Sequence, residues 1–340
     1  MQLAMRVLDA LASERALEGS EPRFVSGAEL ATQFAVTRSA VWKAVSLLRK
    51  LGTPIQAMTN QGYRLALPAS PLQERAVRSA LNPKVAALLR TGECVGSIKS
   101  TNATLLARTP PPPGCFDFLT AEHQSAGRGR RGRSWLAPPG GAICLSWSWT
   151  FEAMARHMGA LSLVVGIAAL RALRQLGITG VGLKWPNDLV TPQGKLGGIL
   201  IEMQSEAAGP VHMVIGIGIN MALDAELRQR VLAGGRPAED LCSLTAPPLT
   251  RPPARSTLVA ALLDQGVGAI QEFARQGFAP LLDEYLAADT LRDMPVVLNG
   301  GPRGLTEGIA RGVDEDGALR IEHDGAIHRI MAGEVSVRTA

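Results

Sequence analysis

Hydrophobic residues in the first part of the chain recur three or four positions apart, which is the period of an amphipathic helix. This spacing predicts a helix near residues 3–17 and a second one that starts after Ser26. Ser26 is followed three residues later by Glu29, the pattern of a capping box at a helix N-terminus. A third helix is predicted to start at Thr37 and to stop at Gly52. Its hydrophobic positions fall on one face: Val41, Ala44, Val45, Leu48 and Leu51.

Two short strand-like stretches follow this helix, on either side of a turn at residues 60–62. Three compact helices and a hairpin are the order of a winged helix-turn-helix, so residues 1–66 are predicted to be a DNA-binding domain. The stretch from Thr37 to Arg64 holds five basic residues and no acidic one. A basic solvated face on a small protein-binding domain is the alternative. The residues predicted to meet DNA are Arg38, Ser39, Trp42, Lys43, Ser46 and Arg64.

The middle of the chain mixes strand and helix patterns after a linker at residues 67–73. Residues 143–149 alternate between hydrophobic and polar, which predicts a strand with one buried face. The patterns do not repeat as regular βαβ units, so an α+β domain over residues 72–290 is expected. Further strands are predicted at residues 115–122, 195–203 and 211–220, and helices at residues 161–177, 255–275 and 278–288.

The last part of the chain is predicted to be short strands joined by tight turns. Asp316-Gly317 and Asp324-Gly325 are dipeptides typical of hairpin turns. We therefore expect a small β-barrel over residues 291–340, and a multidomain α+β protein as a whole.

Composition adds few constraints. A hydrophobic content of 46% with 19% charged residues is typical of a globular protein, and the net charge of +5 is mild. The four cysteines form no C-x-x-C pair, which predicts reduced thiols in a cytoplasmic protein. Asp9 and Glu14 interrupt the N-terminal apolar pattern, so a signal peptide is not expected. No run reaches the roughly 18 apolar residues of a membrane span, so no membrane contact is expected.

The segment "GRGRRGR" at residues 127–133 contains a literal G-x-G-x-x-G. A dinucleotide-binding loop needs a helix directly afterwards, but the prolines and glycines at 138–141 prevent one. Arginine binds phosphate through its bidentate fork, and glycines with four repelling cations should be mobile until a polyanion orders them. We interpret the loop as a phosphate clamp. A solvated basic loop, or nonspecific nucleic-acid contact, is the alternative.

Two further segments, "KWPNDL" at 184–189 and "KLGGIL" at 195–200, place two lysines, an amide and a carboxylate close together. Asp188 is a candidate ligand for Mg²⁺ or a polar nucleotide contact. Lys195 starts an apolar strand and can present a cation to a pocket.

With these residues identified, the sequence resembles a known family. The motifs "STN" (100–102), "GRGRRGR", "KWPNDL", "KLGGILIE" and "GIGIN" (216–220) occur in the order and approximate spacing of biotin protein ligases. With the winged helix, the chain resembles the bacterial bifunctional type, which is ligase and biotin-operon repressor in one chain. The resemblance implies a class II synthetase-like catalytic domain with a mixed sheet, and an SH3-like C-terminal domain.

The resemblance also implies a two-step reaction. Biotin's carboxylate attacks the α-phosphate of MgATP to give biotinyl-5′-AMP and pyrophosphate. A lysine of a biotin carboxyl carrier protein, as in acetyl-CoA carboxylase, then attacks the mixed anhydride, takes the biotin and releases AMP. Because the first step joins two anions, the protein must supply positive charge and orientation. The implied further partners are operator DNA and a second copy of the chain, which would dimerise when the adenylate is bound.

Site roles follow from the same resemblance. The implied catalytic residues are Lys195, Arg130 and Arg128, and the implied metal ligand is Asp188. The implied biotin site consists of Ser100, Thr101, Asn102, Gln124, Arg128, Gly129, Arg130, Lys195, Gly198 and Gly218. The implied nucleotide site consists of Arg131, Arg133, Trp135, Asn187, Asp188 and Asn220.

Three alternatives stay open at this point. The first is a monofunctional ligase whose N-terminal domain represses nothing. The second is a biotin-sensing transcription factor without catalysis, and the third is a lipoate ligase with the same fold and acyl-adenylate chemistry. Lys195 and the complete arginine loop argue against the second. The compact glycine-lined pocket expected here argues against the third, which would need a long acyl tunnel.

Overall fold

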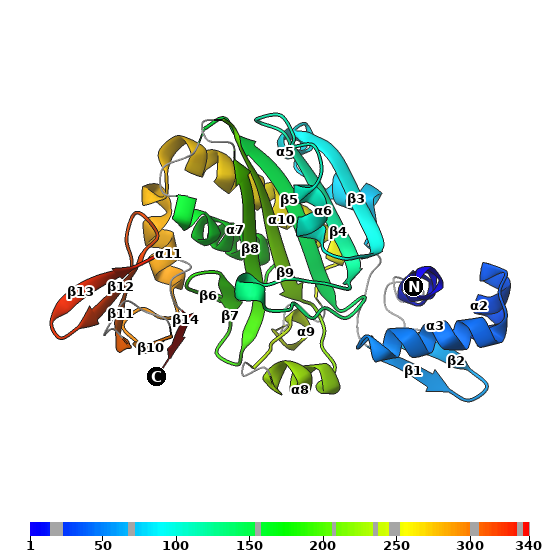
Figure 1. Cartoon of the computed structure of the whole chain (residues 1–340). Helices are drawn as coiled ribbons and strands as arrows, with labels where there is room; N and C mark the ends of the chain where they lie inside the picture. The colour runs from blue at the N-terminus through cyan, green and yellow to red at the C-terminus, as the bar shows by residue number, and fades with distance from the viewer. Residues whose placement is uncertain are drawn as a thin grey trace.

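The computed structural model contains three units in a row, which Figure 1 shows from the N-terminal helices through a central sheet to a C-terminal sheet. It describes residues 1–13, 23–66, 72–153, 158–205, 209–233, 237–244, 252–299, 306–331 and 336–339. Most of the predicted linker lies outside the described residues, and the predicted domain boundaries stay predictions.

The N-terminal unit has the predicted order of three helices and a hairpin. Ser26 caps the second helix, since its Oγ accepts a hydrogen bond from the Glu29 N–H at 3.0 Å, and Thr37 caps the third in the same way. The Glu29 carboxylate accepts a hydrogen bond from the Ser26 backbone N–H, which completes the predicted capping box, and it also pairs with Arg23 at 2.8 Å. The elements are α1 (Gln2–Ser13), α2 (Gly27–Phe34), α3 (Arg38–Lys50), β1 (Ile55–Met58) and β2 (Gly62–Leu65).

The central unit is built on a seven-stranded sheet with the order β3-β4-β5-β9-β8-β7-β6. Only β3 and β4 run parallel, and the other neighbours are antiparallel, so the sheet is mixed as expected. Its strands are β3 (Leu89–Ile98), β4 (Phe116–Gln124), β5 (Ala142–Phe151), β6 (Gly182–Lys184), β7 (Asp188–Val190), β8 (Lys195–Ser205) and β9 (Val211–Asn220).

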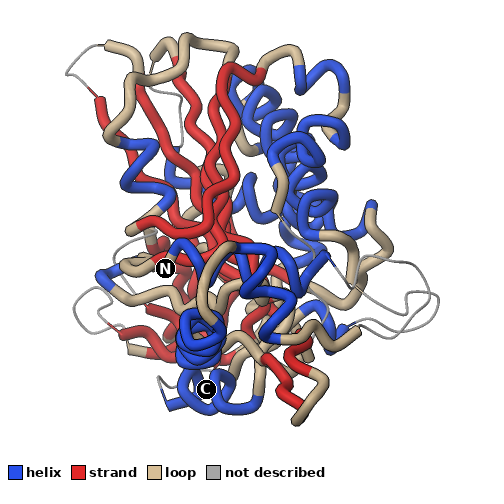
Figure 2. Tube along the Cα trace, turned by 90° about the vertical axis from the view of Figure 1, so that its right-hand side faces the viewer, coloured by secondary structure: helices blue, strands red, loops and turns tan. Residues whose placement is uncertain are grey.

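Helices cover both faces of this sheet. The long helices α7 (Leu161–Gln175) and α10 (Arg255–Gln276) pack together on one face, where Figure 2 shows them stacked beside the strands. Helix α6 (Thr101–Leu106) packs on β4, β5 and β9 from the other face. The expectation of one buried face for the strand at 143–149 is therefore wrong, because every residue of β5 is buried.

Smaller elements complete the central unit, and the sequence patterns did not predict most of them. They are α4 (Glu74–Ala80), α5 (Pro83–Ala86), α8 (Ala225–Ala233), α9 (Leu241–Leu244) and α11 (Leu282–Ala288), together with the 3-10 turns η1 (Arg130–Gly132), η2 (Met158–Ala160) and η3 (Ala279–Leu281).

The C-terminal unit is a five-stranded antiparallel sheet with the order β13-β12-β11-β10-β14. Both predicted turns are present, since Gly317 and Gly325 have φ values of 78° and 74°. This agrees with the small β-domain expected from the sequence. Its strands are β10 (Pro295–Asn299), β11 (Glu307–Val313), β12 (Leu319–His323), β13 (Ala326–Ile330) and β14 (Ser336–Thr339).

Buried hydrophobic residues form one core in the N-terminal unit, one core shared by the other two units, and a small separate cluster of Leu105, Leu119 and Val214. Val7, Leu30 and Val45 belong to the first. Val296 and Ile321 of the C-terminal sheet belong to the same cluster as the central strands and helices. The C-terminal sheet is therefore packed onto the central unit through apolar side chains.

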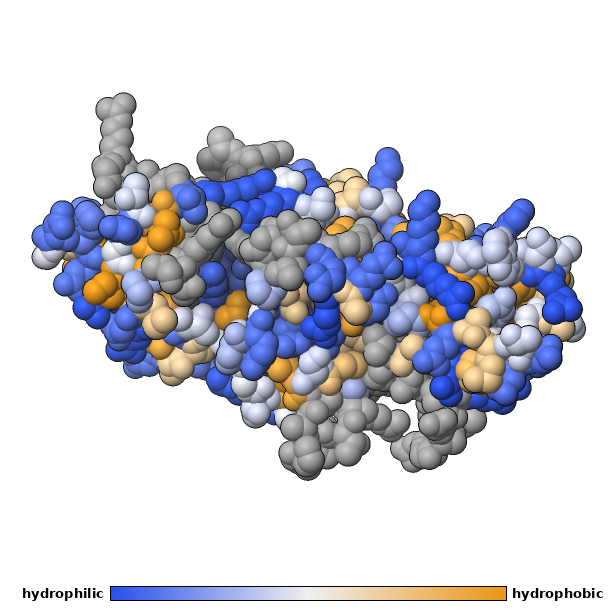
Figure 3. Space-filling view, turned by 90° about the horizontal axis from the view of Figure 1, so that it is seen from below, coloured by the Kyte–Doolittle hydropathy of each residue, from blue (hydrophilic) through white to orange (hydrophobic). Residues whose placement is uncertain are grey.

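One helical stretch, Met158–Gln175, meets the length and hydropathy of a membrane span, with a mean hydropathy of 1.3. It is 67% buried inside the protein, as expected for the core helix of a globular domain. On the face seen in Figure 3, hydrophilic side chains are widespread and hydrophobic ones form small separate groups.

Candidate active site and DNA-binding face

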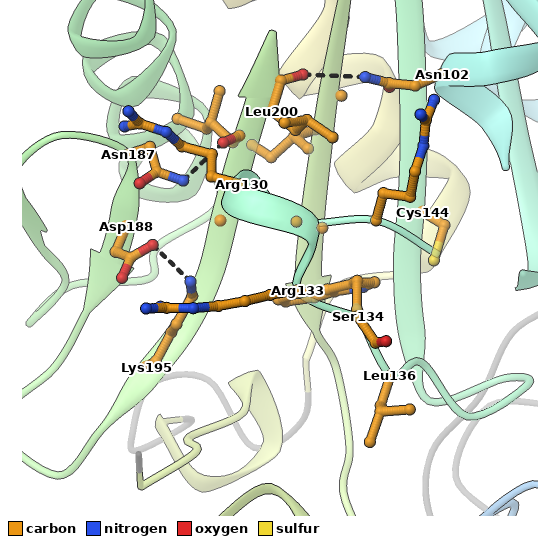
Figure 4. A pocket seen from close by; sticks show the side chains of 18 of the residues that line it. Asn102, Arg130, Arg133, Ser134, Leu136, Cys144, Asn187, Asp188, Lys195 and Leu200 are labelled. Carbon is orange, nitrogen blue, oxygen red and sulfur yellow. Dashed lines mark hydrogen bonds and ion pairs between the residues drawn. The ribbon is translucent and has the colours of Figure 1, made fainter. Parts of the chain in front are cut away.

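A cavity of about 470 Å³ opens beside β5, β8 and β9 and is closed over by the arginine–glycine loop (Figure 4). Every residue that the sequence placed in the biotin or nucleotide site lines it. These are Ser100, Thr101, Asn102, Gln124, Arg128, Gly129, Arg130, Arg131, Arg133, Trp135, Asn187, Asp188, Lys195, Gly198, Gly218 and Asn220.

One end of the cavity, which we name the amide end, is formed by Ser100, Thr101, Asn102, Gln124 and Ser146. Thr101 donates from both its backbone N–H and its hydroxyl to Gln124 Oε1, at 2.8 and 3.1 Å. The buried Ser146 Oγ lies 2.6 Å from both Thr101 Oγ1 and Asn102 Oδ1. This end is a connected set of neutral polar groups, which suits a ligand with neutral hydrogen-bonding groups.

Asn102 is fixed by the neighbouring strand β8. Its amide donates to the Leu200 carbonyl at 3.1 Å and to Glu202 Oε2 at 2.9 Å. Glu202 also pairs with Arg128, at 3.0 Å, and so connects the loop to the amide end. Sequence reasoning assigned no role to Ser146 or Glu202. The alternation of β5 and β8 could have indicated them, since Ser146 faces the same side as Cys144, and Glu202 the same side as Gly198.

Glycines on β9 make room at two places. A Cβ on Gly216 would lie 2.2 Å from Asn102 Oδ1, and one on Gly218 would lie 2.5 Å from the Trp135 ring. Since real Cβ contacts are longer than this, both positions need glycine. A Cβ on Gly198 would be 3.1 Å from Lys195 Nζ, so the cation passes close over the strand.

The arginine–glycine loop forms a compact turn. Its base is held by an antiparallel bridge between Arg128 and Ser134 and by the Gly129 N–H, which donates to the Arg133 carbonyl at 2.7 Å. At its tip Arg131 has a φ of 58°, in the left-handed region. That the loop is mobile when empty stays a prediction.

The opposite end of the cavity, which we name the cationic end, is formed by Arg130, Arg133 and Lys195 with Asp188. Figure 4 shows both arginines extending from the loop toward the wall that carries Asp188 and Lys195. Burial, followed by the positive charge of Arg131, lowers the pKa of Arg130, although Asp188 opposes the shift. Within the described part of the chain, the Arg130 guanidinium makes no ion pair. The cationic end therefore suits an anion.

Lys195 and Asp188 form an ion pair at this end. Lys195 Nζ lies 2.5 Å from Asp188 Oδ1 and 6.0 Å from the centre of the Trp135 ring. The ring sits between Lys195 and Gly218, so Trp135 separates the cationic end from the glycines of β9.

The side-chain amides of two predicted nucleotide-binding residues, Asn187 and Asn220, donate hydrogen bonds to backbone carbonyls of the protein. The Asn187 amide donates to the Ile199 carbonyl at 2.8 Å. The Asn220 amide donates to the carbonyls of Glu239, at 2.9 Å, and Lys195, at 3.3 Å. Both side chains line the cavity, but these bonds fix its walls.

The described residues include no cluster of three or more histidine, cysteine or acidic side chains suited to a metal ion. Asp188 is the carboxylate at the cationic end. One carboxylate is enough when a nucleotide supplies the remaining oxygens, because Mg²⁺ usually binds one or two carboxylates with substrate phosphates and water. All four cysteines are free thiols, and burial raises the pKa of Cys144 to about 12.

Five of the six predicted DNA-binding residues lie on α3, and Arg64 lies on β2. Arg38, Ser39, Trp42 and Lys43 are exposed, whereas Ser46 is half-buried between them and the core. Trp42 is 60% exposed, which is unusual for so large an apolar side chain. The half-buried Arg64 stacks on Phe24 and donates to Gln56, so it braces the hairpin.

Three family models match the chain in the order of its three units. They are an HTH domain over residues 15–64, the biotin/lipoate A/B protein ligase family over residues 96–220, and the biotin protein ligase C-terminal domain over residues 295–338.

Curated relatives match nearly the whole chain. The chain is 35% identical to the bifunctional ligase/repressor BirA of Salmonella typhimurium, over 94% of this chain and 95% of the relative. It is also 35% identical to the BirA of Escherichia coli, over 93% and 94%. A biotin protein ligase of Aquifex aeolicus, solved in complex with biotin and ATP, shares the fold at 23% identity, with a TM-score of 0.61 over 74% of this chain and all of that one. The chain therefore belongs to the family of bifunctional biotin protein ligases and biotin-operon repressors.

Proposed function

We propose that the protein forms biotinyl-5′-AMP from biotin and ATP, transfers the biotin to a lysine of a biotin carboxyl carrier protein, and represses transcription by binding operator DNA. The observation that carries the proposal is the division of one cavity into a neutral amide end and a cationic end. A small neutral ring system with a carboxylate tail fits this division, with the tail toward Lys195.

The first step needs positive charge between two anions. Lys195 is the residue placed to meet both the biotin carboxylate and the α-phosphate, since its amino group lies over Gly198 at the boundary of the two ends. Arg128 and Arg130 close over the bound intermediate, and Arg131 and Arg133 meet the phosphates that leave. Such preorganised cations stabilise charge that develops in the transition state without needing a covalent nucleophile.

The remaining roles divide between the two substrates. Ser100, Thr101, Asn102 and Gln124 hold the polar groups of biotin, and Gly129, Gly198 and Gly218 allow a close approach of the backbone. Trp135, Asn187 and Asn220 form the adenine side. Asp188 would hold a Mg²⁺ ion bound with ATP, and that ion would supply positive charge at the phosphates.

The neutral, glycine-lined amide end also favours biotin over lipoate. Gly216 and Gly218 let Asn102 and the Trp135 ring pack directly against β9, so these side chains, and not a long acyl tunnel, occupy the space above the two glycines. In the second step the acceptor lysine attacks the mixed anhydride and AMP leaves, so the carrier must reach the cavity past the arginine–glycine loop.

The repressor function rests on the exposed surface of α3. Arg38 and Lys43 bring positive charge to a helix of the size that fits a major groove. A palindromic operator would be matched by a homodimer, which we propose forms when the adenylate is bound.

Two assays test the proposal. The purified protein with biotin, MgATP and an acceptor carrier domain should label the carrier, and omission of ATP should abolish labelling. Operator DNA should shift in a gel at physiological salt with biotinyl-5′-AMP present. Labelling without any shift would leave a monofunctional ligase, whereas a shift without labelling would leave a biotin-sensing transcription factor.

A further inference from the structure

The buried indole of Trp185 joins the cavity wall to the C-terminal sheet. Trp185 is 2% exposed, and its Nε1–H donates to the carbonyl of Gly317 at 3.0 Å, across 132 positions of the chain. Gly317 lies in the turn between β11 and β12, and Trp185 in the turn between β6 and β7. One hydrogen bond therefore connects a turn of the C-terminal unit with the segment that carries Asn187 and Asp188.

The turn that accepts this bond is rigid. Asp314 Oδ1 accepts from the backbone N–H groups of Asp316 and Ala318, both at 3.0 Å, and the Gly317 N–H donates to the Asp314 carbonyl at 2.9 Å. Arg329 of β13 pairs with Asp314 at 2.6 Å and also with Asp316. Since these bonds fix the turn internally, the direction of the Gly317 carbonyl is fixed as well.

Contact between this turn and the central unit is close. Gly317 has a φ of 78°, and a Cβ there would lie 2.7 Å from Ala160 Cα, just before α7. The first turn of α7 also holds the same cavity wall, because Ser162 Oγ donates to the Pro186 carbonyl at 2.9 Å. The Trp185–Pro186 segment is thus held from two sides, by α7 and by the C-terminal turn.

The segment held in this way belongs to the cationic end only. Trp185, Pro186, Asn187 and Asp188 all line the cavity, and Asp188 pairs with Lys195. The amide end is fixed by other bonds, from Ser146, Leu200 and Glu202. A displacement of the Trp185 turn should therefore move the nucleotide side of the cavity and leave the biotin side in place.

We infer that Trp185 is a positioning residue through which the C-terminal sheet sets the affinity of the cationic end for ATP. The inference rests on the proposed function, since it concerns the same cavity. The role proposed for the indole does not require contact with the reacting atoms. It fixes the turn that carries Asp188, and the Gly317 carbonyl is the contact through which it acts.

Trp185→Phe tests this, because it keeps an aromatic ring but removes the donor and leaves a buried carbonyl unpaired. The KM for ATP should rise about tenfold, as expected for the loss of one buried hydrogen bond, while the KM for biotin changes less than about twofold. Transfer from supplied biotinyl-5′-AMP to a carrier domain should keep its wild-type rate. Trp147→Phe is the matched control, since Trp147 is equally buried and its Nε1 has no hydrogen-bond partner among the described residues.

A second variant, Asp314→Ala, releases the turn without touching the cavity and should raise the KM for ATP in the same selective way. It carries the test by itself if Trp185→Phe does not fold, as judged by near-ultraviolet circular dichroism. Wild-type KM values in the folded variants, or equal rises for biotin and ATP, would overturn the inference. If wild type and Trp147→Phe also failed to label the carrier, the proposed function itself would fail, so the two failures are distinguishable.

Discussion

The two ends of the cavity are built on opposite principles. At the amide end, the groups bond to one another, as Ser146, Thr101 and Gln124 do in sequence. At the cationic end, charges are collected on a turn and a strand, and Arg130 makes no ion pair with any described residue. The hydrogen bonds of the amide end are formed within the protein, whereas the positive charge of the cationic end is neutralised only when an anionic ligand binds.

Because of this difference, the two ends should be sensitive to different kinds of substitution. A connected set of short hydrogen bonds is sensitive to volume, because no neighbour can move without breaking a bond. A set of cations is sensitive to charge, since its repulsion is relieved only by an anion. Volume and charge substitutions at the two ends should therefore have separable kinetic effects.

The largest effect is expected for Lys195→Ala. It removes the cation at the boundary of the two ends, and adenylate formation should fall by about a thousandfold, the upper range for the loss of one preorganised charge-stabilising donor. Single-turnover formation of biotinyl-5′-AMP measures the loss. Biotin affinity, followed by calorimetry, should fall far less than this, because only the contact with the carboxylate is lost and the amide end is intact.

Lys84→Ala is the control for this variant, since Lys84 is exposed and lies outside the cavity. It should form the adenylate at the wild-type rate. Adenylate formation by a folded Lys195→Ala variant at a comparable rate would contradict the role of the lysine in the chemistry.

Gly216→Ala tests the amide end by volume alone. Its methyl group would lie 2.2 Å from Asn102 Oδ1, so Asn102 must move and the bonds to Ser146 and Glu202 must change. Biotin affinity should fall about a hundredfold, at the upper cost of overpacking a rigid site, with ATP affinity nearly unchanged. Gly268→Ala on α10 is the matched control, because a Cβ there meets nothing within 4 Å. Equal binding of biotin by both variants would refute the claim that the amide end cannot accept added volume.

Arg130→Gly tests the cationic end by charge. It removes a partly buried guanidinium, and the bound adenylate should dissociate at least about tenfold faster, as for the loss of one hydrogen bond to a charged group. Stopped-flow displacement of a labelled intermediate measures this rate. Arg292→Gly is the control, since Arg292 is 52% exposed and lies outside the cavity. Release at the wild-type rate would mean that the arginine does not hold the phosphate.

The two ends also differ in how far the sequence predicted them. Residues with a distinct charge or a short motif, such as Lys195, Asp188 and the arginine loop, could be assigned to the site from the sequence alone. Alternation could place Ser146 and Glu202 on a strand face but not in the cavity, because that depends on distant neighbours. Strand β5 pairs with β9 across 60 to 78 positions of the chain, and Glu202 meets Asn102 across 100 positions. The bond from Trp185 to Gly317 is even more distant, at 132 positions, and no local pattern contains it.

The fold shows the same limit. The two capped helices and the hairpin turn of the N-terminal unit were predicted from local signals, because caps such as Ser26 and Thr37 act within three residues. Residues 14–17 of the first predicted helix lie outside the described residues. In the central unit, β5 was expected to be half-exposed. Its polar residues are in fact covered by α6, a short helix that has too few residues for a clear hydrophobic period.

The smallest effect is expected for Asp289→Asn, which tests the residue that pairs with the strand leading into the Trp185 turn. Asp289 pairs as a bridge with Leu183 beneath the Trp185 turn, and burial, opposed mainly by a backbone hydrogen bond from Leu291, raises its pKa from 3.8 to about 6. The folded protein therefore binds a proton at this carboxyl more tightly than the unfolded chain does. Stability should be greatest below about pH 4 for this group and should decline as the pH rises to about 6.

Because Asp289 is partly exposed, the decline should be about 1 kcal/mol, less than the full shift would give. Asparagine keeps an oxygen that can accept the hydrogen bond from the Leu291 N–H, which lies 2.9 Å from Asp289 Oδ1, but it does not ionise. Urea unfolding of wild type and Asp289→Asn between pH 4 and pH 7 should therefore diverge as the pH rises from about 4 to about 6, with the variant more stable above that range. Parallel curves would show that this carboxyl titrates alike in both states. If the stability curves diverge and the variant also has a lower KM for ATP at pH 7, the negative charge of Asp289 affects the cationic end and not the amide end.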